Sequence, residues 1–575
     1  MDKKFLLAIV LSFLVIYGWQ AMFPPPPPPK PATQQQQPQK VTSEPSGTAA
    51  PPATGTPVPS PVEVEAAKPL VAASAEQDIT VDNDAVTAVF TTKGGVLKSW
   101  RLKKYLDGVG QPLELVPQNI PNAPKPFTLA VDNQATAAKL RSALFRADRD
   151  QVTVAADGTA LNFVYEDAAG LVAHKTFIFS ATQPYIVHFT ADVKENGTTL
   201  NPTIEWGPAL NTGVVSGGMI YAPAPQPIFY RDRKVTRVQI KNIDQHKQEQ
   251  GAFGFAGVDD HYFLSAIIPA SPTLDVRYEP LSVPVEGETQ ARQFIAWSVR
   301  GPSPPKDAEF FFGPKDLDIL QHIKPDLIRA IDFGMFDWLV VPLLRALKWL
   351  NSYIGNYGWS IIALTVIINI IIFPLRHKSV VSMRKMQEIQ PQLKAIQDRY
   401  AKLKVTDPAK QKMNEEVMAL YRQSGANPAT GCVPTLLTFP VLLAFYAMLS
   451  VAIELRGAPF VAWIHDLSIH DPWYVLPILM GITMFVQQRM TPASADPVQQ
   501  KMMMFMPIMF TGMLMRAPVG LVLYWTISNL WGIGQTAITN KLIGPPPQHA
   551  VRPPAERQLK TAGAGKTPQA SKERK

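Results

Sequence analysis

The sequence predicts an α-helical polytopic membrane protein of six spans, five of which form a core, with an external all-β sandwich domain. Three observations support this prediction: charge-free apolar segments in the second half, an apolar run behind Lys3 and Lys4, and about 250 residues of strand-like alternation between them. The charge-free segments are Trp359–Leu375, Val433–Ile453, Trp473–Gln488, Met502–Met515 and Ala517–Asn540.

Residues 1–23 predict a signal-anchor span. Two lysines precede an apolar run that ends at Phe23, and no small-x-small cleavage site follows. We therefore expect an uncleaved anchor, with a cleaved signal as the alternative. Residues 24–76 predict a linker, because this stretch is rich in proline and cannot bury enough apolar surface to fold.

Residues 77–325 predict a mainly antiparallel β-sandwich. Short runs alternate apolar and polar side chains, as half-buried strands do. The clearest runs are Ala85–Phe90, Gln151–Val154, Leu161–Tyr165, His174–Phe179 and Tyr185–Thr190. Asp157-Gly158 predicts a hairpin, and Asn196-Gly197 predicts another tight turn. Lys315–Ile323 predicts a short helix that closes the domain.

Residues 331–352 predict an amphipathic helix that lies in the membrane interface. Its apolar residues, from Phe336 to Leu350, share one face, and Pro342 should kink it. The charged residues on the other faces are Asp337, Arg345 and Lys348. The alternative is a helix packed on the β domain.

The net charge of +9 is concentrated in two segments beside the spans. Residues 376–428 hold eleven Lys and Arg against five acidic residues, and the tail 541–575 holds eight against two. By the positive-inside rule both segments lie in the cytoplasm, as do the amino and carboxyl termini. In a bacterium this topology predicts an inner-membrane protein with a periplasmic β domain.

Residues 353–540 form the predicted membrane core, interrupted by the cytoplasmic insertion 376–428. Helical periodicity over Val380–Leu403 and Pro408–Gln423 predicts a helical hairpin in this insertion. Met502–Met515 is a short span, because fourteen residues cover only about 21 Å of a hydrocarbon core of about 30 Å. We expect burial by neighbouring helices or local thinning of the bilayer.

Uncharged polar residues inside the spans predict a hydrophilic substrate groove. Spacings of three or four residues stack such side chains on one face of each helix. Two interpretations remain open: the faces line a cavity, or they hydrogen-bond neighbouring helices together. The residues assigned to the groove are Thr365, Asn369, Thr438, Thr483, Gln487, Gln488, Tyr524, Trp525 and Asn529.

Basic residues near the cytoplasmic ends of the helices predict a rim that docks partners. Such residues can meet anionic lipid, ribosomal RNA or an acidic protein. The alternative is a solvated charged face that only fixes topology. The residues assigned to the rim are Arg376, Arg384, Lys385, Lys394, Arg399 and Arg489.

Several functions are not expected from this sequence. It has no phosphate-binding lysine loop, and Gly251–Gly257 lacks the spacing of a nucleotide loop. No Ser–His or Cys–His arrangement indicates nucleophilic catalysis. Cys432 is expected to be a buried packing residue. We expect no enzyme activity, no cofactor, no metal and no small-molecule substrate.

Several blocks of the chain match the motifs of a known family. They are Phe312–Lys315, Asn427–Pro434, Phe439–Pro440, Ala462–Leu467, Asp471–Pro472, Leu476–Gly481, Gln499–Lys501, Met506–Pro507, Gly520–Tyr524 and Ser528–Asn529. With these blocks the chain resembles the YidC family of membrane protein insertases, in the Gram-negative form with a large periplasmic domain. The resemblance covers most of residues 310–540.

The resemblance implies a protein that inserts newly made membrane proteins and assists their folding, alone or beside the Sec translocon. It also implies a groove open to cytoplasm and lipid, and a basic tail that engages ribosomes. Thr365 matches a groove position, and Trp525 matches an aromatic substrate contact. Many relatives place an arginine where this chain has Asn369, so Arg376 and Arg489 are candidates to supply the charge.

Two other functions serve as alternatives. A solute transporter predicts ion-coupling residues and internal repeats, and the spans show neither. A membrane-anchored periplasmic scaffold predicts spans that act only as anchors. Deletion of residues 77–320 separates the scaffold from the insertase, because lasting insertase activity would exclude the scaffold.

Overall fold

The computed structural model describes residues 69–543, except residues 119, 121–122, 156–157, 212–224, 270–272, 284–290, 401–408, 425–427 and 491–496. The predicted signal anchor, most of the linker and the tail beyond residue 543 lie outside the described residues. The chain divides into two compact units. In the described part, the smaller unit covers residues 389–424, and the larger unit holds the β domain and the other helices.

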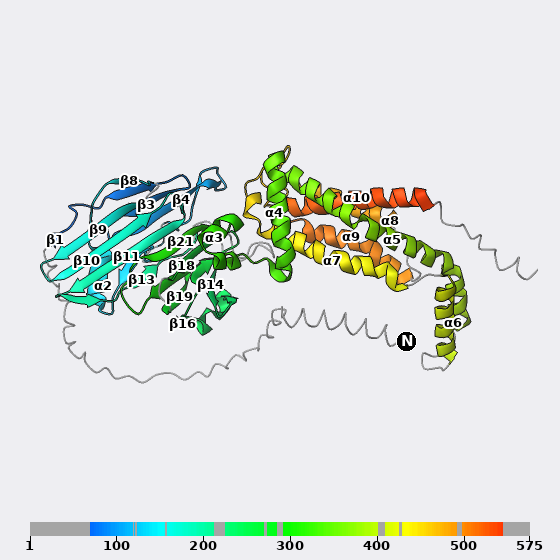
Figure 1. Cartoon of the computed structure of the whole chain (residues 1–575), viewed down its shortest axis with the longest axis horizontal. Helices are drawn as coiled ribbons and strands as arrows, with labels where there is room; N and C mark the ends of the chain where they lie inside the picture. Colours follow the sequence, from blue (N-terminus) through cyan, green and yellow to red (C-terminus); the bar gives the residue numbers. More distant parts are fainter. Residues whose placement is uncertain are drawn as a thin grey trace, which may run out of the picture. The chain divides into compact units, whose positions relative to one another are not determined.

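An antiparallel sheet of eleven strands dominates the β domain (Figure 1). Its strand order is β1-β9-β10-β11-β21-β18-β17-β14-β15, with β7 paired to β9 and β12 paired to β11. The bounds are β1 (Pro69–Val71), β7 (Arg146–Ala147), β9 (Thr159–Asp167), β10 (Leu171–Phe179), β11 (Ile186–Glu195), β12 (Thr198–Leu200), β14 (Gln226–Arg231), β15 (Lys234–Arg237), β17 (Phe255–Asp259), β18 (Phe263–Ile268) and β21 (Ala308–Pro314).

Two further sheets of five strands complete the sandwich, in the orders β16-β19-β20-β13-β6 and β5-β4-β3-β2-β8. The bounds are β2 (Asp78–Asp82), β3 (Val86–Thr91), β4 (Val96–Leu106), β5 (Pro112–Glu114), β6 (Thr128–Ala130), β8 (Gln151–Thr153), β13 (Thr203–Trp206), β16 (Gln248–Gly251), β19 (Leu274–Val283) and β20 (Arg292–Arg300). A short helix, α2 (Gln134–Ser142), follows β6. The predicted strands are therefore confirmed.

Phenylalanines fill the interior of the sandwich. The inward residues of β9 and β10 are buried at every second position, which is the period of a strand with one face on the core. The ring of Phe177 lies 4.8 Å from Phe90, 5.1 Å from Phe127 and 5.0 Å from Phe189. These contacts join β3, β10, β11 and the segment before β6 into one apolar core.

One turn prediction is confirmed, and the other is wrong in its strand pairing. Asn196 and Gly197 both have positive φ and join β11 to its antiparallel partner β12. Asp157 lies outside the described residues, and the strands on either side do not form the expected hairpin. Instead β8 pairs in parallel with β2, and β9 pairs with β10. A turn is present, because the Gly158 amide donates to the Ala155 carbonyl at 3.2 Å, but β8 and β9 belong to different sheets, so only the expected strand pairing is wrong.

The linker also ends earlier than residues 24–76 predict. Pro69–Val71 forms β1, an edge strand paired with β9. Proline is tolerated there because an edge strand leaves one row of backbone groups unpaired. The β domain therefore begins at residue 69 within the described part of the chain.

Short helices lead from the β domain to the helical part. They are α3 (Leu317–Ile323), η2 (Pro325–Ala330), η3 (Gly334–Phe336) and α4 (Asp337–Ile354). The predicted amphipathic helix is α4, which contains Pro342 and ends at Gly355 with φ of 72°. It starts later than residue 331, because Ile331 and Phe333 are buried with the apolar core.

The remaining helices are α5 (Tyr357–Arg399), α6 (Ala409–Gln423), α7 (Pro428–Val451), η4 (Ile453–Leu455), α8 (Val475–Met490), α9 (Pro497–Leu514) and α10 (Val519–Ile543). Two predicted span ends are wrong: Ile453 lies beyond α7, and the exposed Trp473 precedes α8. Helix α9 has 18 residues and begins before the predicted segment Met502–Met515, but its apolar part, Met504–Leu514, is short, as expected. Helix α8 has 16 residues and covers about 24 Å, so it stays short of the hydrocarbon core.

Among the described residues, one helix, Tyr357–Ser382, is long and apolar enough to cross a membrane by length and composition. Shorter apolar helices run over Pro440–Val451, Val475–Met490 and Met504–Leu514. The number of spans therefore remains a prediction.

The predicted cytoplasmic hairpin consists of the end of α5 and helix α6. Its first helix is not separate, because α5 continues from the apolar segment to Arg399 without a break. The Arg399 guanidinium and the Tyr400 hydroxyl each lie within 3.0 Å of the Glu416 carboxylate. These contacts hold the two helices of the smaller unit together.

Candidate functional site

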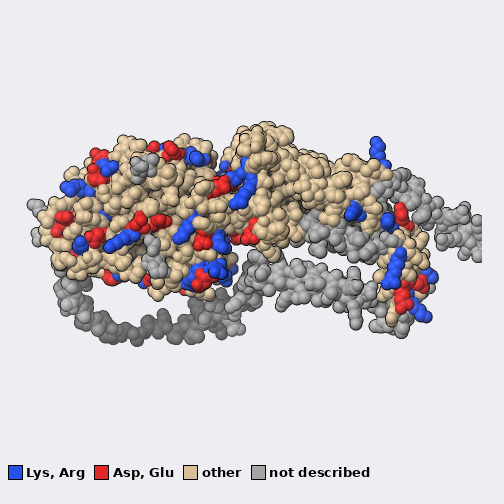
Figure 2. All heavy atoms as spheres, in the orientation of Figure 1, with Lys and Arg blue, Asp and Glu red and all other residues tan. Residues whose placement is uncertain are grey.

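The helical part of the larger unit buries uncharged polar side chains among its apolar core residues. Its buried polar side chains are Ser360, Thr365, Asn369, Thr483, Thr526, Asn529, Gln535 and Thr539. Large apolar side chains of the same helices are exposed, and Ile371 is 69% and Phe505 63% exposed. Figure 2 shows charged residues scattered over the β domain and few over the helices next to α4. Such a pattern is typical of a surface that faces lipid and a packed interior that also holds polar groups.

A ladder of polar groups follows one face of α5. The Thr365 hydroxyl donates to the Ile361 carbonyl at 2.6 Å, and the Asn369 amide donates to the Thr365 carbonyl at 2.8 Å. The Asn369 amide oxygen accepts a hydrogen bond of 2.9 Å from the Arg376 guanidinium. Arg376 is half-buried and reaches back along the helix. The structure therefore brings together two predicted groove residues and one predicted rim residue.

A second polar contact joins α8 to α10. The buried Asn529 amide donates to the Thr483 hydroxyl at 3.3 Å and to the Met480 carbonyl at 3.4 Å. Thr483 in turn donates to the Met480 carbonyl at 2.8 Å. At these two residues, hydrogen bonding between helices is confirmed.

A third polar contact joins α5 to α10 through residues that the sequence prediction did not assign. The Gln535 amide donates to the Phe373 carbonyl at 3.4 Å, and His377 Nδ1 lies 3.4 Å from the Thr539 hydroxyl. Gln535 and Thr539 are four residues apart, so their helical spacing was a usable signal. The spacing does not show which neighbouring helix Gln535 and Thr539 face.

Tyr524 and Trp525 are neighbours in sequence but lie on different sides of α10. The buried Tyr524 ring stacks on Phe445 of α7, with centroids 4.1 Å apart. The half-buried Trp525 ring lies 6.0 Å from Phe510 of α9. Tyr524 thus packs α10 on α7, whereas part of the Trp525 side chain stays exposed.

The two glutamines of α8 are half-buried. Gln487 packs so closely on Gly532 of α10 that any side chain at Gly532 would collide with its amide. Gln488 lies beside it on the helix. Thr438 lies in α7, but its side chain is outside the described part of the structure. The groove assignments of Gln487, Gln488 and Thr438 therefore stay predictions.

The predicted rim residues are divided between the two compact units, and each is described by its own contacts. Lys385 and Lys394 are exposed, and Arg399 pairs with Glu416 at 3.0 Å. The exposed Arg489 lies 4.9 Å from the Phe485 ring on its own helix. The side chain of Arg384 is outside the described part of the structure. Of the six, Arg376 alone has a hydrogen bond to a predicted groove residue among the described side chains.

The described residues hold no group of three or more His, Cys, Asp and Glu that could bind a metal ion. The apolar segments of α8, α9 and α10 contain no acidic residue. The chemistry that this interior offers is therefore hydrogen bonding by hydroxyl and amide groups, with the Arg376 guanidinium at one end.

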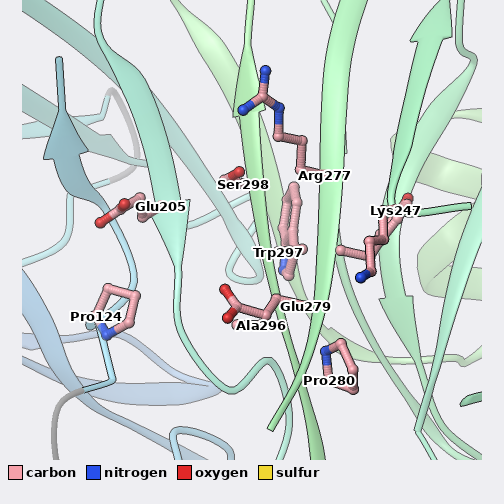
Figure 3. Close-up of a pocket in the computed structure, with 10 residues that line it drawn as sticks. Pro124, Glu205, Lys247, Arg277, Glu279, Pro280, Ala296, Trp297 and Ser298 are labelled. Carbon is pink, nitrogen blue, oxygen red and sulfur yellow. The ribbon is translucent and has the colours of Figure 1, made fainter. Parts of the chain in front are cut away.

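A hollow of about 520 Å³ lies on the β domain (Figure 3). Glu205, Arg277 and Glu279 flank it, and the small side chains of Ala296 and Ser298 leave space between the strands. Both Glu205 oxygens accept from the Arg141 guanidinium at 2.7 Å. Its charges are of both signs and partly paired, so this hollow does not favour one class of ligand.

Two families match the chain. Residues 78–346 match the YidC periplasmic domain, and residues 349–545 match the 60Kd inner membrane protein. Together these matches cover the β domain and the helices described above.

Curated relatives match over most of the chain. The membrane protein insertase YidC of Geobacter metallireducens is 36% identical over 563 residues, which cover 94% of this chain and 99% of the relative. The membrane protein insertase YidC of Syntrophus aciditrophicus is 35% identical over 575 residues, which cover 94% of this chain and 100% of the relative.

Solved structures give weaker likenesses. An active YidC insertase crystal structure, with the first transmembrane domain resolved, has 18% identity and a TM-score of 0.33, covering 82% of this chain and 95% of that one. A galactose mutarotase related enzyme from Lactobacillus acidophilus has 9% identity and a TM-score of 0.26, covering 41% of this chain and 97% of that one. Likenesses at these scores say nothing about function.

Proposed function

Because this chain belongs to the YidC family of membrane protein insertases, we propose that it inserts its clients through a hydrophilic groove between its helices. Membership makes it an inner-membrane protein with a periplasmic domain, and its function is membrane protein insertion rather than catalysis. The proposal concerns the route that a client takes and the residues that line this route.

The observation that supports the groove most strongly is the contact between Arg376 and Asn369. The resemblance to the family implies an arginine at the position of Asn369 in many relatives. In this chain Arg376 extends its guanidinium to the amide of Asn369. A positive charge therefore lies beside the buried polar ladder of α5. In a low-dielectric interior this charge attracts acidic residues of a client more strongly than it would in water.

Hydrogen bonding and bilayer thinning supply the rest of the proposed mechanism. Hydroxyl and amide groups of the groove replace the water around a polar client segment, which lowers the cost of moving it into the membrane. Helix α8 has 16 residues, so its length of about 24 Å favours a thinner bilayer at this site. The apolar segment of the client then slides from the groove into lipid.

The proposed topology has six spans, with both termini in the cytoplasm. The proposed partners are nascent membrane proteins, the Sec translocon, and ribosomes bound through the basic tail and the cytoplasmic hairpin. Exposed Lys385 and Lys394 support a docking role for the hairpin. The apolar outer surface of the helices supports direct contact with the bilayer.

Depletion of the protein tests the proposed function. Insertion of small membrane proteins should fall when the protein is depleted, and it should return with the wild-type chain but not with a chain lacking the groove residues. Unchanged insertion after depletion would exclude the proposal.

A further inference from the structure

Lys348 of α4 joins segments that are far apart in the sequence. Its Nζ lies 2.5 Å from Asp318 Oδ2, 3.5 Å from Asp316 Oδ2 and 3.0 Å from Glu454 Oε1. Asp316 caps α3 of the β domain and Asp318 lies in its first turn. Glu454 lies in η4, directly after α7. One ammonium group is therefore the common partner of the periplasmic domain and of the outer end of α7.

The cluster depends on this lysine because its carboxylates outnumber its cations. The Glu454 side chain is 7% exposed and that of Lys348 is 23% exposed. Burial raises the pKa of Glu454, and the Lys348 ammonium opposes this effect. Without the ammonium, Glu454 would be a buried charge beside Asp316. Removing one partner of a buried ion pair is strongly destabilising.

Arg456 provides a second contact between the same loop and the β domain. Its guanidinium lies 5.1 Å from the Phe263 ring and 5.8 Å from the Tyr262 ring, both at the start of β18. It also donates to the Leu106 carbonyl at 3.5 Å. The loop after α7 is therefore held on the β domain by two cations, and Lys348 is the one that also belongs to α4.

Helix α7 connects this cluster to the proposed groove. It packs on α4 and η3, and its Phe445 ring stacks on Tyr524 of α10 at 4.1 Å. A shift of the outer end of α7 therefore moves a neighbour of the α10 wall, because packed cores transmit strain.

We infer that Lys348 is a positioning residue for insertion, which fixes the outer end of α7 to the β domain so that a client segment leaves the groove on the periplasmic side. The inference rests on the proposed function, since it assigns Lys348 to the exit of the groove and not to client capture. Capture at Asn369 and Trp525 does not require the lysine.

The test compares capture with completed insertion in full-length protein reconstituted into proteoliposomes. Capture is the yield of a photo-crosslink from Trp525 to a nascent client, and insertion is the protease-protected product. Lys348→Met should keep the crosslink and lower the insertion rate roughly fivefold or more, and Lys348→Arg should restore most of the rate. Arg345→Met is the matched control, because Arg345 lies on the same helix and contacts only Gln321 among the described side chains.

A double variant separates positioning from general loss of folding. Lys348→Met with Glu454→Gln removes both charges, so its insertion rate should exceed that of Lys348→Met alone. Two outcomes would contradict the inference. In the first, Lys348→Met inserts clients at the wild-type rate. In the second, Lys348→Met loses both capture and insertion, and the double variant recovers neither. Failure of the proposed function has a different signature, because the wild-type protein would then give no crosslink from Trp525.

Discussion

The Arg376 guanidinium donates a hydrogen bond of 2.9 Å to the Asn369 amide oxygen, seven residues away on the same helix. Seven residues are close to two helical turns, so the two side chains share one face of α5. Asn369 is buried, and its amide also donates to the Thr365 carbonyl. Asn369 is therefore an anchor that holds a positive charge next to the polar interior.

The first prediction concerns the position of the positive charge that insertion of acidic clients requires. Arg376→Gln should reduce insertion of clients with acidic translocated segments several-fold, because about 1.4 kcal/mol of lost attraction equals a factor of ten. Adding Asn369→Arg to Arg376→Gln returns a charge to the same face and should restore insertion. The measurement is the insertion rate of one client with and without its acidic residues.

Arg489→Gln is the control for this prediction, since it also removes one basic residue but lies outside the polar ladder. Asn369→Arg alone is informative as well. If neither Arg376→Gln nor Asn369→Arg changes the insertion of acidic clients, fixed charge is not what the groove supplies.

The second prediction uses two glycines of α10. A methyl group at Gly532 would collide with the Gln487 amide, whereas nothing lies within 4 Å of a methyl group at Gly534. Gly532→Ala should displace Gln487 and lower the insertion rate, with little loss of folding because a flexible side-chain end can move. Gly534→Ala should leave insertion unchanged. Equal insertion by the two variants would show that the position of Gln487 is not important.

The polar ladder shows how far the sequence can predict this site. The spacing of Thr365 and Asn369 predicts one polar face, and both residues are buried on it. The contact of Asn529 with Thr483, and that of His377 with Thr539, depend on which helices are neighbours, and helical periodicity carries no information about neighbours. The Lys348 cluster was missed for the same reason, because its partners lie in a different domain.

The β domain gives a similar comparison. The alternation in β9 and β10 predicts both strands, since one face of each meets the core. The pairing of β8 with β2 could not be predicted, because Asp157-Gly158 gives a local hairpin signal and a parallel pair depends on a distant strand.

The third prediction concerns the pH dependence of folding. Burial lowers the pKa of Lys175 from 10.5 to about 7. Its Nζ lies 2.7, 3.1 and 2.8 Å from the carbonyl oxygens of Gly94, Gly95 and Phe127. The ammonium can donate to all three oxygens and the neutral amine to two. Because the folded state binds this proton less tightly than the unfolded state, the stabilising effect of Lys175 should be largest above pH 10.5 and decrease as the pH falls toward 7.

The direction of this pH dependence can be checked by thermal or denaturant unfolding of the wild type and Lys175→Met at pH 7 to 9.5. The difference in unfolding free energy between them should rise with pH by up to about 1.4 kcal/mol per pH unit. Lys104→Met, at an exposed position, should show no such trend. Parallel pH profiles for wild type and Lys175→Met would contradict the prediction.

The fourth prediction concerns the loop between α7 and α8. The carboxylate of Asp471 is buried and accepts from Trp463 Nε1 at 2.9 Å and from the Leu476 amide at 2.8 Å. Asp471→Ala should destabilise this loop by about 1–3 kcal/mol, because the first turn of α8 and a half-buried indole N–H lose their acceptor. Faster proteolysis of the loop in Asp471→Ala than in the wild type would demonstrate this destabilisation. Asp466→Ala, which removes only contacts to Ser468, should have a smaller effect.

Site-specific photo-crosslinking to a nascent client tests the central claim most directly. Crosslinkers at Asn369, Gln488 and Trp525 would be compared with one at Ile371, which is 69% exposed on α5. A client that passes through the polar groove should crosslink from the first three positions before insertion and only weakly from Ile371. Equal yields from all four positions, or crosslinks from Ile371 alone, would show that clients do not use the groove.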